Sequence, residues 1–130
     1  MKNLLFLTLL CFSFNAFATK WVPIKINGIE MPYYVDVANI TKKRDLVYFW
    51  KLWNHPHITT LVNISGSKSH LSKVKLDCGS GEYSVLAQEL YADEMCNGKK
   101  VMELGGAKPS HARPDTQMGQ VIKFVCKYTK

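Results

Sequence analysis

Two cysteines far apart in the sequence, Cys78 and Cys126, carry the clearest potential chemistry, because thiols on neighbouring elements can form a disulfide. Cys78 ends the stretch 74–78, where apolar and polar residues alternate as in a half-buried strand. A second set, at helical spacing, consists of Met118, Val121, Ile122, Val125 and Cys126. We predict a C-terminal helix packed on a sheet and tied to it by a Cys78–Cys126 disulfide. Closing a loop of about 48 residues would add about 4 kcal/mol by chain-entropy arguments.

The chain begins with the features of an export signal. Lys2 gives a positive start, residues 4–14 form an apolar run, and Ala16-Phe17-Ala18 is a small-x-small cleavage site. The run is too short to span a bilayer as a mature helix. We predict a signal peptide at 1–18 and one domain at 19–130, exported and not membrane-spanning.

Removal of the signal peptide discards Cys11 and leaves three cysteines, an odd number in a compartment where disulfides form. Cys96 lies in a turn-like stretch, residues 93–98, and we predict that it is the unpaired one. Such a thiol stays free or forms an intermolecular bridge. The second case would give a homodimer.

Two histidines stand close together in His55-Pro56-His57, directly after an aromatic stretch. With His70 or His111 they could bind a transition metal or haem iron. Two imidazoles without a third ligand of known geometry are a weak signal, and an exposed polar loop explains them. We therefore predict neither a metal nor a cofactor.

The pattern of possible nucleophiles and carboxylates does not favour an enzyme. Ser80 stands between two glycines, but a nucleophile elbow needs glycine two residues either side of the serine, where this chain has Cys78 and Glu82. No pair of carboxylates places a general acid beside a base. Asp36 and Asp77 are predicted to cap turns.

Basic and aromatic residues point to binding. The formal net charge is +7, and 15 of the 17 basic residues are Lys, which is typical of a solvated surface or of weak attraction to anionic molecules. Trp21, Trp50, Trp53 and Tyr48 could stack on single-stranded nucleic acid, but export argues against that partner. A Trp53 on the solvent face would suit a protein or glycan.

Short strands joined by turns are predicted along the rest of the chain. The expected strands are 21–26, 29–36, 46–53, 58–64, 74–78, 83–91 and 99–104, with a hairpin turn at Asn27-Gly28. Thr41–Asp45 is expected to be a charged loop, and 105–114 a linker before a helix capped by Asp115 or Thr116. We predict an α+β fold, an antiparallel sheet of about five to seven strands with the C-terminal helix on it.

The strand 46–53 has two possible core faces. One carries Val47, Phe49, Lys51 and Trp53, and the other Leu46, Tyr48, Trp50 and Leu52. The second face has no charged residue, so we predict that it faces the core.

An ordered set of motifs resembles the surface-adhesin protein E family. The set is Trp21, Tyr33-Tyr34-Val35-Asp36, Val47…Trp50-x-Leu52, Asp77-Cys78, Tyr91…Met95…Gly98-x-x-Val101 and Val125-Cys126. The resemblance implies a small exported bacterial domain, an antiparallel sheet with its helix tethered by the Cys78–Cys126 bond. For named members it also implies adhesion to host matrix or serum proteins. Cys96, and His111 where a Trp is expected, depart from the pattern.

We predict a non-enzymatic, adhesin-like binding protein of a bacterial surface, contacting host or envelope macromolecules. The candidate binding residues are Lys42, Lys43, Arg44, Trp53, His55 and His57. The alternative is a periplasmic accessory protein, inhibitor or envelope protein with no adhesive role.

Overall fold

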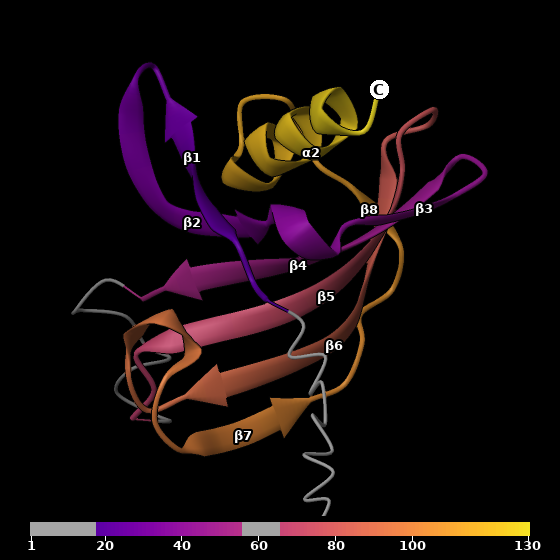
Figure 1. Cartoon of the computed structure of the whole chain (residues 1–130). Helices are drawn as coiled ribbons and strands as arrows, with labels where there is room; N and C mark the ends of the chain where they lie inside the picture. Colours follow the sequence, from indigo (N-terminus) through magenta and orange to yellow (C-terminus); the bar gives the residue numbers. More distant parts are fainter. Residues whose placement is uncertain (1–17, 56–65) are drawn as a thin grey trace, which may run out of the picture.

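The computed structural model describes residues 18–55 and 66–130 (Figure 1). The chain starts with a hairpin of β1 (Trp21–Ile26) and β2 (Ile29–Asp36), as predicted. Its turn residues Asn27 and Gly28 have φ of 51° and 77°, the left-handed region that this pair tolerates. β1 is an edge strand, which explains how Pro23 is accommodated without a backbone donor.

The strand β4 (Leu46–Asn54) is central to the sheet and pairs on one edge with two different strands. β2 pairs with residues 51–53, and β3 (Thr41–Lys43) pairs with residues 46–48. A single turn of 3-10 helix, η1 (Val37–Asn39), crosses between them. The prediction of a loop at Thr41–Asp45 is wrong, because its first three residues pair their backbone with β4 while their side chains stay exposed.

The second half of the sheet follows the same antiparallel pattern. It contains β5 (Ser69–Asp77), β6 (Glu82–Tyr91), β7 (Lys100–Leu104) and β8 (Ser110–His111), with a 3-10 turn, η2 (Glu94–Cys96), before β7. The described residues form eight strands, in the order β1-β2-β4-β5-β6-β7, with β3 on β4 and β8 on β6. β3 and β8 are not among the predicted strands and lie in the segments predicted as a loop and a linker. The predicted strand 58–64 lies outside the described residues.

The C-terminal helix, α2 (Gln117–Tyr128), packs on the sheet as predicted. Thr116 is its N-cap and accepts a hydrogen bond from the Gly119 N–H at 3.1 Å. The Cys78–Cys126 disulfide is present and joins the end of β5 to the helix, with the two Cα atoms 5.7 Å apart. Figure 1 shows α2 beside the β1–β2 hairpin, with β7 at the far edge of the sheet. Within the described part of the chain, no helix is long and apolar enough to cross a membrane.

The core lies between α2 and the face of β4 that carries Val47 and Phe49, which are 0% and 1% exposed. The predicted core face of this strand is therefore wrong. Lys51 belongs to the helix-facing side and approaches Met118 of α2, and its charge makes that face look solvent-exposed in the sequence. Leu52, on the opposite face, is also buried, so both faces of β4 are partly covered.

Candidate binding surfaces

The β3–β4 connection carries three of the predicted binding residues, Lys42, Lys43 and Arg44, which we call the basic hairpin. All three side chains are exposed. Arg44 forms the turn with φ of 56°. None of the three forms an ion pair with another residue of the described ranges, where the ion pairs involve Lys100 and Arg113. The neighbouring carboxylate of Asp45 is exposed as well and forms no ion pair with them.

A hollow of about 170 Å³ lies beside the basic hairpin. Lys42 and Asp45 line it from one side, and Lys130, at the end of the chain, lines it from another. The Cys78–Cys126 disulfide forms part of the wall. The disulfide thus brings the C-terminal lysine close to the hairpin, so that Lys42 and Lys130 line one hollow together with Asp45.

Trp53 and His55 lie elsewhere and are not exposed as expected. The Trp53 ring stacks on Tyr33 with centroids 5.8 Å apart and packs against the core cluster below α2. His55 is 5% exposed, and its ring meets the Trp53 ring edge-on at 4.7 Å. The expectations that Trp53 lies on the solvent face and that His55 belongs to an exposed loop are wrong. His57 lies outside the described residues.

His70 joins this aromatic cluster, with its ring 6.1 Å from the His55 ring. Burial, together with the nearby positive charge of Lys51, lowers the pKa of His70 to about 4. An imidazole in this setting stays neutral at physiological pH. Across residues 18–55 and 66–130, no group of three or more His, Cys, Asp or Glu side chains is arranged to hold a metal ion.

Cys96 is outside the disulfide and partly buried in η2. Its backbone N–H donates to the Ser69 hydroxyl at 2.9 Å. Burial raises the pKa of the Cys96 thiol to about 11, which makes it a poor nucleophile at neutral pH. A bridge from Cys96 to a second copy stays a prediction.

The turn around Ser80 has a structural explanation. The Asp77 carboxylate accepts hydrogen bonds from the N–H groups of Gly79 and Ser80, at 2.8 and 3.3 Å. The Ser80 hydroxyl accepts from the Glu82 N–H at 3.2 Å. Asp36 caps η1 in the same way, accepting from the Ala38 N–H. Both aspartates therefore cap turns, as predicted.

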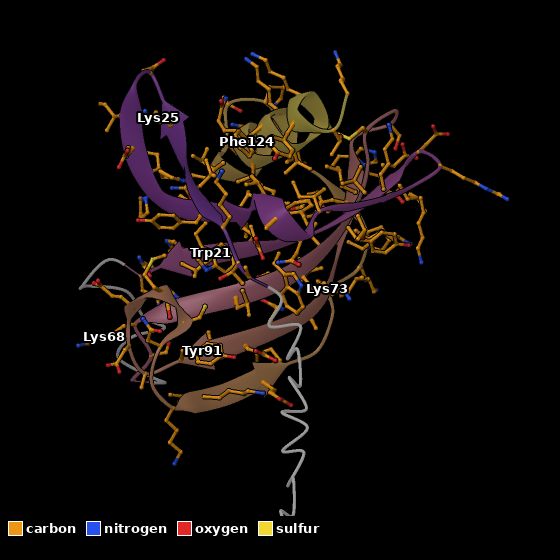
Figure 2. The ribbon with its side chains drawn as sticks, viewed as in Figure 1. Trp21, Lys25, Lys68, Lys73, Tyr91 and Phe124 are labelled. Atoms are coloured by element: carbon orange, nitrogen blue, oxygen red, sulfur yellow. A yellow bond between two sulfur atoms is a disulfide. The ribbon has the colours of Figure 1, made fainter. Side chains whose placement is uncertain are left out.

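A basic groove that the sequence pattern does not single out lies between β1 and α2. It has a volume of about 420 Å³, with Lys25 on the strand and Lys123 and Lys127 on the helix. Phe124 contributes to its apolar floor, and Figure 2 labels Phe124 and Lys25 on the facing elements. Helical spacing identifies the exposed side of α2, but only the tertiary structure places β1 opposite it.

The order of strands, the helix and its disulfide can now be compared with known proteins. The family model for surface-adhesin protein E matches residues 21–127. The chain belongs to this family. The resemblance noted in the sequence is thereby confirmed, and membership makes the chain a surface-adhesin-like protein. No curated protein sequence matches it.

Solved structures of protein E from Haemophilus influenzae share the fold. One is 16% identical with a TM-score of 0.60, and the match covers 82% of this chain and 83% of that one. Its selenomethionine form gives a TM-score of 0.62 at 16% identity, with coverage of 85% and 95%. At this identity the likeness supports the architecture, and the residues on the surface can differ freely.

Proposed function

We propose that this chain is an exported, non-enzymatic adhesin-like protein that uses its basic hairpin to contact an acidic host or envelope macromolecule, a protein or a glycan. The observation that carries the proposal is the exposed trio Lys42, Lys43 and Arg44, which has no ion-pair partner among the described residues. Membership of the surface-adhesin family supports the adhesive role.

Charges in this position attract a partner at a distance. The Debye length is about 8 Å at physiological ionic strength, so exposed cations act over roughly one side-chain length and lose strength as salt increases. Complementary charges on two surfaces mainly raise the rate of association and set the register. Binding through the hairpin therefore requires a marked dependence of affinity on salt concentration.

The test compares two variants that remove the same charge. The hairpin variant is Lys42→Ala, Lys43→Ala and Arg44→Asn, because Asn tolerates the left-handed backbone at position 44. The control is Lys25→Ala, Lys123→Ala and Lys127→Ala, in the groove between β1 and α2. Binding to immobilised matrix proteins, serum proteins and sulfated polysaccharide is measured over a range of salt concentrations.

We expect the hairpin variant to lose about tenfold in affinity at low salt, which corresponds to about 1.4 kcal/mol, and to show a flatter salt dependence. The control is expected to change affinity less. Equal losses in the two variants would mean that net charge alone drives binding, and an unchanged hairpin variant would remove the hairpin from the contact.

The location is tested on intact cells. A membrane-impermeant label or an added protease reaches a surface protein but not a periplasmic one. We expect labelling of the mature chain. Protection, followed by release on osmotic shock, would replace the adhesive proposal with a periplasmic accessory role.

A further inference from the structure

The face of the sheet opposite α2 has an opening where β4 lacks a neighbouring strand. β2 pairs with Lys51–Trp53 and β3 with Leu46–Tyr48, so Phe49 and Trp50 have no strand partner on that edge. η1 crosses this interval without pairing. Since successive side chains of a strand point to opposite faces, Phe49 enters the core and Trp50 points to the other side.

Trp50 and Trp21 line a hollow of about 390 Å³ at this opening, which we call the tryptophan hollow. Its lining residues are Thr19, Trp21, Asp36, Asn39, Trp50 and Leu71. Trp21 begins β1 directly opposite Asp36 of β2, and Trp50 approaches from β4, so separate strands supply the two indoles. Both are half-buried. The volume falls in the range of small-ligand sites.

Asp36 holds the hollow in shape. It is 1% exposed, and its carboxylate accepts hydrogen bonds from the Lys20 N–H at 2.9 Å, the Ala38 N–H at 3.1 Å and the Asn39 amide at 2.6 Å. These contacts fasten the segment before β1, η1 and the end of β2 to one another. The two tryptophans therefore project from a backbone that is already fixed, which reduces the ordering cost of binding a ligand.

Several polar groups around the hollow have no hydrogen-bond partner within the described residues. They are the indole N–H groups of Trp21 and Trp50, the side-chain oxygen of Asn39, whose amide group donates to the Asp36 carboxylate, and the hydroxyl of Thr19. The lining of the hollow thus combines two aromatic side chains with residues that carry donors and acceptors. A ligand that fits must combine an apolar face with a rim of hydroxyl groups.

A cation stands next to this arrangement. The Lys73 ammonium lies 5.6 Å from the centroid of the Trp50 ring, within the range of a cation–π contact. Lys73 is the register partner of Trp50 on β5 and forms no ion pair with any residue in the described ranges. Lys73 lines a neighbouring hollow of about 140 Å³, which shares Asn39 and Trp50 with the tryptophan hollow, so a positive charge lies at the boundary between the two. Figure 2 labels Trp21 and Lys73.

We infer that the tryptophan hollow binds a sugar ring of a glycan, and that Lys73 favours a sugar that carries a carboxylate. A pyranose has an apolar face of C–H bonds that packs on an electron-rich indole ring, and equatorial hydroxyls that bond to donors and acceptors at its rim. The hollow and the basic hairpin share no residue, so the two proposals can be tested separately.

The test uses the indole N–H signals of the intact protein in heteronuclear NMR. The chain has three tryptophans, and single Trp→Phe variants assign their signals. The probes are lactose, chitotriose and 3′-sialyllactose at millimolar concentration. We expect 3′-sialyllactose to shift the signals of Trp21 and Trp50. The signal of Trp53, which packs on the helix-facing side, should stay unchanged. No shift with any probe, or a shift of Trp53 alone, would overturn the proposal.

Variants separate the contributions of stacking and charge. Trp50→Ala is expected to lower affinity at least tenfold for every sugar that binds, while Lys73→Met lowers it for 3′-sialyllactose and not for lactose. Thermal unfolding checks that each variant is folded. If Trp50→Ala does not fold, Lys73→Met, at a half-buried position of β5, still tests the site. Equal affinity of Lys73→Met and wild type for 3′-sialyllactose would overturn the preference for a carboxylate. The hairpin variant should bind sugar as wild type does.

Discussion

The ammonium of Lys51 lies 3.9 Å from the sulfur of Met118, so a lysine of β4 meets a methionine of α2 in the layer between sheet and helix. Burial lowers the pKa of Lys51. No carboxylate of the described residues pairs with it. The position therefore holds a cation at a cost in desolvation free energy, offset in part by the packing of its aliphatic stem.

Replacing Lys51 with Met should stabilise the protein. The thioether side chain, one atom shorter than lysine, keeps most of the apolar stem and removes the buried charge, and we expect the free energy of unfolding to rise by about 1 kcal/mol. Urea denaturation measures the change. Lys123→Met, at an exposed position of α2, is the control and should stay within about 0.5 kcal/mol of wild type. A loss of stability in Lys51→Met would show that the ammonium is needed.

Gly119→Ala should destabilise the protein although alanine is the better helix former. A Cβ at position 119 would clash with the carbonyl oxygen of Arg113 and lie 3.0 Å from the Cα of Pro114. Both are backbone atoms, and we expect a loss of about 1–3 kcal/mol. Gly105→Ala, where the added Cβ meets nothing within 4 Å, is the control. A stability gain in Gly119→Ala would mean that the chain before α2 moves aside easily.

Removing the Cys78–Cys126 disulfide with paired serine substitutions should lower the free energy of unfolding by about 4 kcal/mol, as expected for its sequence separation of 48 residues. Denaturant unfolding of the oxidised protein and the double variant measures this. Cys96→Ser, outside the disulfide, should have a far smaller effect. Similar losses in both would argue that the packing of the sulfur atoms, rather than the cross-link, is responsible.

The protein should lose stability on acidification through His70. The pKa of His70 is about 4 in the folded chain, against 6.5 for a histidine in water, so between these pH values the unfolded state binds more protons at this position. The contribution of neutral His70 to the free energy of unfolding is fully present above about pH 6.5 and is lost as the pH falls towards 4. Because His70 is only partly buried, we expect this loss of stability to amount to about 1–2 kcal/mol.

Unfolding curves at several pH values check the His70 prediction. His70→Gln should flatten the dependence of the free energy of unfolding on pH between pH 4 and 6.5. At higher pH the curves of wild type and variant should run parallel. Identical slopes for the two proteins across the acidic range would assign the loss of stability to other groups, such as the carboxylates.

Cys96 should react slowly with alkylating reagents. Its pKa is raised to about 11, so the thiolate fraction at pH 8 is about 100-fold below that of a thiol with an ordinary pKa of 9.0. The greater basicity of the thiolate offsets part of this, and we expect alkylation at least tenfold slower than in urea. Mass spectrometry follows the modification. Equal rates in buffer and urea would mean that the thiol is fully accessible and unperturbed.

The amino-acid sequence determined the local elements and their covalent link. The bounds of β1 and β2, the Asn27-Gly28 turn and the Thr116 cap follow from residue types at short spacing. The pairing of Cys78 with Cys126 follows from a strand pattern and a helix pattern that each carry one cysteine. Each depends on backbone preferences or on periodicity that a few neighbouring residues express. The sequence does not reveal β3 and β8, because they are short and their side chains are exposed, so no apolar alternation marks them.

Only the tertiary structure decided which side of each strand the helix covers. Alternation along 46–53 reveals two faces, but Lys51 makes the covered face look polar, and the pattern consequently assigns Trp53 to solvent, where the structure packs it half-buried against the core. His55, predicted to belong to an exposed polar loop, is buried beside it. The same choice of face brings Trp21 of β1 and Trp50 of β4 to one hollow on the uncovered side. Residues so far apart in the sequence meet through strand pairing and the path of η1, which short-range patterns do not encode.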